Sequence, residues 1–176
     1  LLVIFIYVFF KPASYTTSLT LNITRIGTQN TDNYKYDAFY RLQADEKFAE
    51  TLVEWLKSPR IEEKIFEEAG INTSNYSLKN LSKSIKAEKM SSQIVSVRFS
   101  SSNKKSASDI AAAISKIISQ NTQNLNKEQK NETWFEVIFE SPVIKIDKIS
   151  LLAIVFSFLG AIFAGFMAVM IKHYLS

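Results

Sequence analysis

The chain has 176 residues, 47% of them apolar and 22% charged, a length that suits one domain of ordinary size and excludes two independent enzymatic domains. Its net charge is +4, but 20 of the 21 Lys and Arg lie between Lys11 and Lys148 together with all 17 Asp and Glu. Because both signs mix along that stretch, the basic balance does not indicate nucleic-acid binding, and the uncharged ends indicate a membrane protein with a soluble insert.

Residues 1–10, LLVIFIYVFF, are the first uncharged segment. Ten residues are too few to cross a bilayer alone, since a spanning helix takes about 20. We interpret the segment as the outer part of a first transmembrane helix whose start is missing. The alternative is the apolar core of a signal peptide, although no Ala-x-Ala-like cleavage site precedes Lys11 and Pro12.

The next segments predict a strand followed by helices. From Tyr15 to Thr24, apolar or β-branched residues alternate with polar ones, which is the pattern of a half-buried strand. Apolar residues at spacings of three and four predict an amphipathic helix from Tyr34 to Lys57. A second helix begins at Ser58 and Pro59, which suit the N-cap and first helical positions, and Gly70 is predicted as its left-handed C-cap.

Two further elements follow in the middle of the chain. A short third helix is predicted from Ser77 to about Ala87, where Leu and Ile recur at three and four. A strand is predicted from Gln93 to Ser100, with Val95, Val97 and Phe99 on one face.

The last part of the soluble stretch predicts a helix and a strand. Ser106 and Asp109 form a plausible capping arrangement for a helix that extends to Leu125. Trp134 to Glu140 reads as a third strand, which Pro142 closes. The sequence therefore predicts an α+β fold, a small extracytoplasmic β-α-α-α-β-α-β domain over residues 11–148 between two transmembrane helices.

Residues 149–171 form the second uncharged segment, and 23 residues in a helix rise about 34 Å, enough for a hydrocarbon core of about 30 Å. We predict a transmembrane helix here, followed by a short cytoplasmic tail at 172–176. Stripes of small residues spaced by four favour close packing against another helix, or else belong to a generic membrane helix. These stripes consist of Ser157, Ala161 and Gly165, and of Gly160, Ala164 and Ala168.

The sequence offers little for catalysis or cofactor binding. It has no cysteine and one histidine, His173, so the usual zinc and haem ligand sets cannot be built, and no cofactor is predicted. No phosphate-binding loop or nucleophile elbow occurs. The acidic pairs 45–46, 62–63 and 67–68 are interpreted as solvated charges on polar helix faces, and Trp55 as a residue of the core or its rim.

Several segments together suggest a family. A strand follows the first apolar segment, a long helix leads to the Lys-Ser-Pro step at 57–59 before IEEKIFEEAGI, and then comes LKNLSKSIKAEKMSSQIVSVRFSSSNKKSASDIAAAISKIIS. This combination resembles the chain-length determinant (Wzz-type) family of polysaccharide co-polymerases over nearly the whole chain. Of the prolines usual in that family before the second membrane helix, Pro142 alone matches. The length of the chain resembles that of the compact members, among them capsular polysaccharide adaptors.

The resemblance implies a non-catalytic regulator of surface polysaccharide (O-antigen, capsule or exopolysaccharide) chain length or export. It implies a homo-oligomer in the bacterial cytoplasmic (inner) membrane, working with a separate polymerase or the growing lipid-linked glycan and, as in the adaptors, with a separate cytoplasmic tyrosine kinase. Two other readings stay open: an extracytoplasmic sensor domain and a structural scaffold of an envelope complex.

Overall fold

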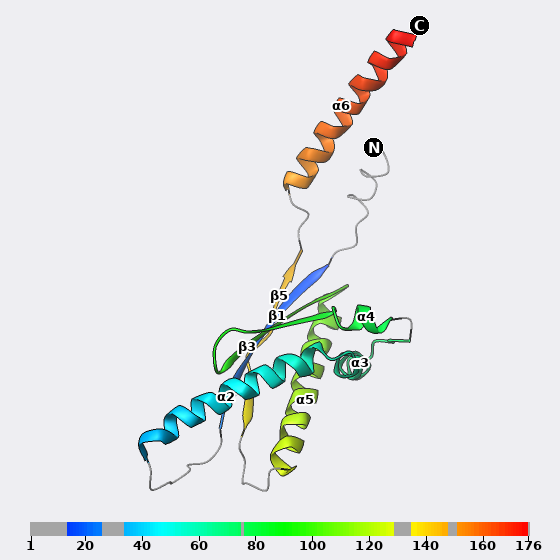
Figure 1. Cartoon of the computed structure of the whole chain (residues 1–176). Coiled ribbons are helices and arrows are strands. Elements are labelled where there is room, and N and C mark those ends of the chain that lie inside the picture. Colours follow the sequence, from blue (N-terminus) through cyan, green and yellow to red (C-terminus); the bar gives the residue numbers. More distant parts are fainter. Residues whose placement is uncertain (1–13, 26–33, 75, 129–134, 148–150, 176) are drawn as a thin grey trace. The chain divides into compact units, whose positions relative to one another are not determined.

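The computed structural model describes residues 14–25, 34–74, 76–128, 135–147 and 151–175. The chain divides into two compact units, one of residues 14–145 and one of residues 1–13 with 146–176. The larger unit holds most of the regular structure (Figure 1). Its elements, in chain order, are β1 (Tyr15–Thr24), α2 (Tyr34–Lys57), α3 (Pro59–Glu68), α4 (Leu78–Leu81), β2 (Ile85–Lys89), β3 (Ile94–Ser101), α5 (Lys104–Glu128), β4 (Glu136–Phe139) and β5 (Val143–Ile146).

The five-stranded sheet has the order β2-β3-β1-β4, and β5 also pairs with β1. Strands β3 and β4 run antiparallel to β1, and β2 runs antiparallel to β3. The predicted alternation of β1 and β3 is confirmed, because Leu19, Leu21 and Val97 on one face are at most 1% exposed. Burial of that face fixes the register of the sheet, since a shift by one residue would turn the apolar side chains to solvent.

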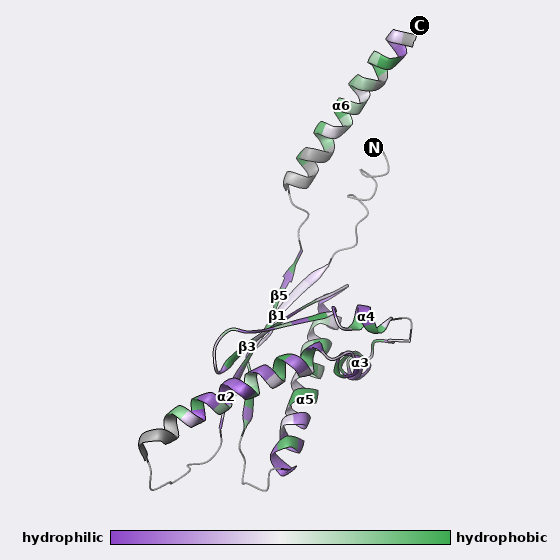
Figure 2. Ribbon diagram, viewed as in Figure 1, coloured by the Kyte–Doolittle hydropathy of each residue, from purple (hydrophilic) through white to green (hydrophobic). Residues whose placement is uncertain are grey.

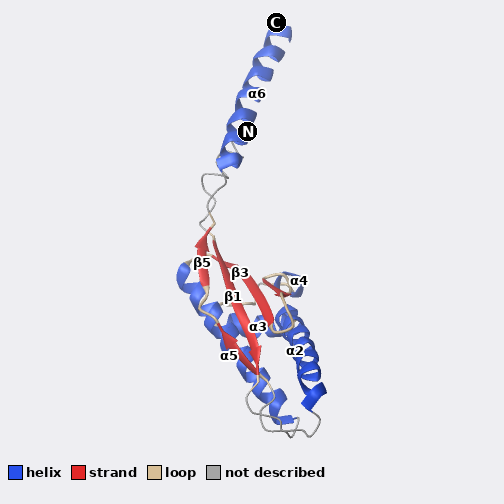
Figure 3. Cartoon of the chain, turned by 90° about the vertical axis from the view of Figure 1, so that its left-hand side faces the viewer, coloured by secondary structure: helices blue, strands red, loops and turns tan. Residues whose placement is uncertain are grey.

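The core lies between this face and the helices α2, α3 and α5 (Figure 3). The fully buried side chains that the helices contribute include Leu52, Leu56, Ile65, Ile110, Ile114 and Ile118. The α3 boundaries agree with the predicted ones, since Pro59 is the first residue of the helix and Gly70 follows its end with φ of 72°. The mixed α and β content therefore agrees with the predicted α+β class.

The predicted element order is wrong at 77–87. Helix α4 ends at Leu81, and Ile85–Lys89 forms strand β2, which pairs with β3. Leu78, Leu81 and Ile85 fit a helical spacing, but Ile85 and Ala87 are buried while Lys86 and Glu88 between them are exposed, which is a strand pattern. The polar turn at 91–93 then makes β2 and β3 a hairpin.

Two more boundaries differ from the predicted ones. Helix α5 begins at Lys104, and its cap is Asn103, whose Oδ1 accepts the Ser106 N–H at 2.8 Å, so Ser106 is not the capping residue. Strand β4 ends at Phe139, one residue before the predicted end at Glu140, and after Pro142 the chain forms β5 beside β1. A proline is tolerated there because it interrupts an edge of the sheet. The domain order is thus β-α-α-α-β-β-α-β-β.

The smaller unit contains α6 (Leu151–Leu175), which coincides with most of the predicted second transmembrane segment (Figure 2). Within the described part of the chain, which leaves out several α6 side chains, no helix combines the length and apolar character needed to cross a membrane. The predicted first membrane segment, 1–10, lies outside the described residues.

Candidate functional surface

A buried ion pair joins the end of β1 to α2. Arg25 Nε donates to Asp45 Oδ1 at 2.6 Å, and the two side chains are 11% and 5% exposed. Gln93 donates to the other Asp45 oxygen at 2.9 Å, so α2 is also tied to the start of β3. The interpretation of Asp45 as a solvated charge is therefore wrong: its neighbours in the fold supply an Arg and an amide that satisfy it.

Aromatic rings extend this junction toward β4. The Arg25 guanidinium lies 5.0 Å from the centre of the Phe135 ring, which stacks on Phe48 of α2 at 4.1 Å. Trp55 is half-buried and meets Phe48 edge-on at 6.1 Å, which confirms its predicted place at the rim of the core. The junction holds one end of the sheet against α2.

Glu62 of α3 is the second acidic residue whose interpretation is wrong. It is fully buried, and neither carboxyl oxygen has a hydrogen-bond partner among the described residues. Burial raises the pKa of Glu62 to about 8, and the nearby backbone N–H groups of Ile85 and Ser84 offset only part of that rise. The carboxyl is therefore protonated at neutral pH, which removes the cost of burying a charge.

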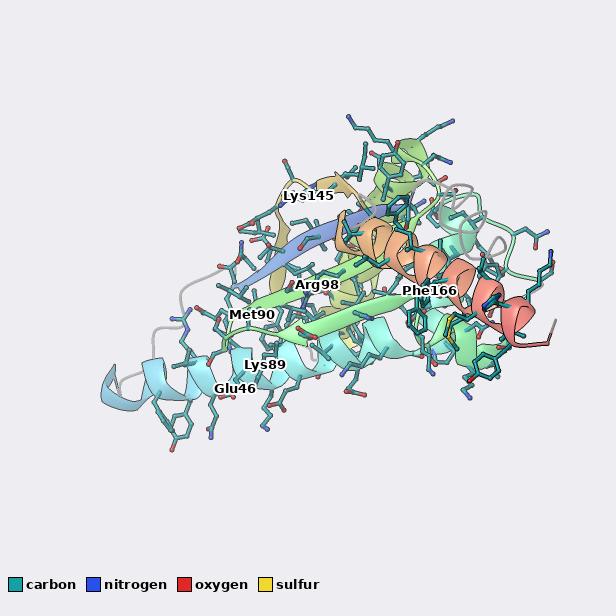
Figure 4. All side chains as sticks on the ribbon, turned by 90° about the horizontal axis from the view of Figure 1, so that it is seen from above. Glu46, Lys89, Met90, Arg98, Lys145 and Phe166 are labelled. Carbon is teal, nitrogen blue, oxygen red and sulfur yellow. The ribbon has the colours of Figure 1, made fainter. Side chains whose placement is uncertain are left out.

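An exposed ion-pair group links α2 to β2. Lys89 Nζ donates to Glu46 at 2.7 Å and to Glu50 at 3.0 Å (Figure 4). Hydrogen bonds to Glu46 and Glu50 raise the pKa of Lys89, and bonds from Lys47 and Lys89 lower the pKa of Glu50. These groups are solvated, so they position α2 rather than form a reactive site.

The sheet face opposite the helices is mostly polar, although the exposed Ile94 and Ile138 lie on it on either side of Asn22. Arg98 of β3, between Ser18 and Lys86 of the adjacent strands, pairs with Glu88 of β2 at 2.9 Å (Figure 4). Further along, Asn22 Nδ2 donates to Glu140 at 3.0 Å. Hydroxyl groups on the same face come from Thr16, Ser18, Thr20, Thr24, Ser96 and Ser100. The planar guanidinium, amide and carboxylate groups of these two pairs, with hydroxyl groups beside them, can form hydrogen bonds with a polar polymer. We therefore treat this open sheet face as the candidate functional surface.

The predicted packing residues all lie in α6. Gly160, Ala161 and Gly165 are exposed and Ala164 is half-buried, while the side chains of Ser157 and Ala168 lie outside the described ones. A Cβ at Gly160 or Gly165 would meet no atom within 4 Å. The described part of this chain therefore leaves both glycines free to contact another helix.

Sequence reasoning missed Glu62, although its spacing relative to Ile65, Phe66 and Ala69 places it on the apolar face of α3. It also missed the Arg25–Asp45 pair, for which spacing gives no signal across 20 residues. Among the described residues, no three His, Asp or Glu side chains gather to hold a metal ion. A comparison with protein-family models and with curated proteins returns no match to this chain.

Proposed function

We propose that this chain is a non-catalytic regulator of surface polysaccharide chain length or export, anchored by helices in the bacterial cytoplasmic membrane and acting as a homo-oligomer with a separate polymerase. The observation that carries the proposal is the pairing of β5 with β1. Strand β4 runs antiparallel to β1, with Thr24 opposite Glu136 and Leu21 opposite Phe139. The chain therefore approaches the start of β1 as it enters β5, and the two ends of the domain lie side by side.

The full sequence of α6, including the residues whose side chains lie outside the described ones, supports the membrane part of the proposal. Its 25 residues rise about 37 Å, which exceeds a hydrocarbon core of about 30 Å. Residues 149–171 carry no charge, and Phe158, Phe163 and Phe166 are each more than 60% exposed. Apolar exposure of this extent calls for lipid or another helix as a partner.

The open sheet face and the family resemblance support the polysaccharide part. The Arg98–Glu88 and Asn22–Glu140 pairs offer donors and acceptors in planar groups, which match the paired hydroxyls of a sugar ring. Binding without bond formation fits a regulator that holds a growing glycan near its polymerase.

The function is tested by the length distribution of the host's surface polysaccharide on a gel. We expect deletion of the gene to abolish a preferred length and restoration to return it. A distribution that stays unchanged after deletion, with polymer still made and no second copy of the gene, would contradict the proposal.

Replacing Gly165 by Leu is expected to weaken the oligomer in detergent. A Cβ at this position meets no described atom of the chain within 4 Å beyond the adjacent backbone of α6, so we expect the added side chain to act on a neighbouring helix. Native mass or crosslinking of the purified chain should show a smaller assembly.

Leu159→Phe is the matched control, because Leu159 is exposed and lies at least about 100° around α6 from every residue of the two small-residue stripes. We expect this variant to keep the assembly of the original chain. Equal assemblies for Gly165→Leu and the original chain would exclude the small-residue contact.

A further inference from the structure

Basic residues are concentrated in one segment of the chain. Residues 77–105 contain seven Lys and Arg and one acidic residue, Glu88, so the segment has a net charge of +6 while the remaining residues together have −2. Such a local excess is an electrostatic feature of its own, because it differs in sign from the rest of the chain.

The fold brings most of this charge to one end of the sheet. The start of β1 pairs with the end of β3, Tyr15 opposite Ser101, and the start of β2 pairs there too, Ile85 opposite Phe99. Lys83 and Lys86 flank the start of β2, and α5 begins three residues after Ser101. We call this the basic end; it consists of Lys79, Lys83, Lys86, Lys104 and Lys105. It includes α4 and the start of α5, elements that Figure 1 labels.

The five lysines of the basic end are exposed, and in the described part of the chain none of them pairs with a carboxylate. Two large apolar side chains accompany them: Leu78 is 71% exposed and Tyr76 is 48% exposed. Protein surfaces that bind lipid headgroups and insert apolar side chains between them combine lysines with exposed residues such as Leu and Tyr.

The basic end is also the end at which the chain leaves the domain toward α6. Strand β5 pairs with β1 and ends at Ile146, and α6 begins at Leu151. Five peptide steps connect the two residues and span at most about 18 Å. If α6 is embedded in lipid, as the proposed function holds, the chain connection keeps the basic end close to the headgroups.

We propose that the basic end is a contact surface for anionic phospholipid headgroups, which holds the domain in a fixed orientation on the bilayer. The inference rests on the membrane anchoring in the proposed function and adds a partner and a surface to it. Each lysine near an anionic surface raises the binding constant roughly fivefold. Several lysines together are therefore enough to hold a tethered domain in one orientation.

The test uses the full chain in lipid-bilayer discs. Because the chain has no cysteine, Ser102→Cys gives one labelling site at the basic end, and Gln43→Cys gives one on α2. Energy transfer to a headgroup-labelled lipid is measured in phosphatidylcholine alone and in phosphatidylcholine mixed with phosphatidylglycerol. We expect transfer from position 102 to rise in the anionic discs and to fall again in 1 M salt, where the Debye length is about 3 Å.

Lys83→Glu with Lys104→Glu should lower the transfer in anionic discs to its value in neutral discs. The control, Lys47→Glu with Lys127→Glu, reverses two exposed lysines away from the basic end and should leave it unchanged. Circular dichroism of both variants checks that they fold. Transfer that ignores lipid charge and the first variant alike would overturn the proposal.

Flotation with neutral vesicles separates this proposal from the anchoring. If the chain floats with neutral vesicles but energy transfer does not respond to lipid charge, the anchoring stands and the proposed lipid contact is overturned. If the chain fails to float with neutral vesicles, the membrane anchoring in the proposed function is contradicted. In that case salt-sensitive flotation with phosphatidylglycerol vesicles, abolished by Lys83→Glu with Lys104→Glu, would still support the contact, and its absence would overturn it.

Discussion

Replacing Glu62 by Gln is expected to remove most of the pH dependence of folding between pH 5 and pH 7. The folded pKa of Glu62 is about 8, against an ordinary value near 4.5 in the unfolded chain. Between these values the folded protein keeps a proton that the unfolded chain has released, so the free energy of unfolding falls as the pH rises. Its contribution is fully present below about pH 4.5 and is lost toward pH 8.

The expected size of the effect is large for one residue. Each pH unit in this window costs about 1.4 kcal/mol, so the original chain should lose about 2 to 3 kcal/mol between pH 5 and pH 7. Glu62→Gln keeps the shape and the neutral state of the protonated acid. The variant should therefore match the original chain at pH 5 and exceed its stability at pH 7. Denaturant unfolding in detergent, followed by the fluorescence of Trp55 beside Phe48, measures both.

Glu67→Gln is the matched control, because Glu67 lies on the same helix and is exposed. Its stability should follow the slope of the original chain at every pH. If Glu62→Gln also follows that slope, the carboxyl is charged in the folded state and its assigned protonation is wrong.

Period and capping residues predicted much of the fold. The alternation of apolar and polar residues predicted β1 and β3 and the faces that they bury. The face of each strand that packs against the helices must be apolar. Pro59 and Gly70 marked the limits of α3, because each suits a specific backbone position. Both signals come from residues close together in the sequence, and they predicted the local structure of β1, β3 and α3 correctly.

The sequence did not predict β2 and β5 because each strand is short and is stabilised mainly by pairing with a neighbouring strand. Ile85–Lys89 contains two buried residues, too few to distinguish a strand from a helical turn, and pairing with β3 decides the matter. Val143–Ile146 has no fully buried residue and is held by pairing with β1. Tertiary pairing of this kind is absent from a sequence window.

The candidate surface was harder to predict than the fold. Arg98 and Glu88 lie ten residues apart, and Asn22 and Glu140 lie 118 apart, so a hairpin register and a strand crossing bring them together. The burial of Asp45 and Glu62 depends in the same way on what packs over them. Acidic residues on amphipathic helices are solvated as a rule, and both exceptions arise where another element covers the carboxyl group.

Replacing Asp45 by Ala is expected to lower the free energy of unfolding by about 3 kcal/mol, because it leaves the Arg25 guanidinium nearly buried without its carboxylate. Gln93 loses its acceptor in the same variant. Urea unfolding in detergent at pH 7 measures the loss. Glu46→Ala, one residue along α2, removes an exposed partner of Lys89 and should cost less than about 1 kcal/mol.

The double variant Arg25→Met with Asp45→Leu distinguishes a buried pair from a packing effect. It removes both charges together, so it should be more stable than Asp45→Ala alone, since the main cost of the latter is an unpaired buried cation. The methionine that replaces Arg25 would also keep part of the packing that the guanidinium makes against Phe135. A double variant less stable than Asp45→Ala would mean that the ion pair itself, together with its contact to Phe135, stabilises the junction between β1 and α2.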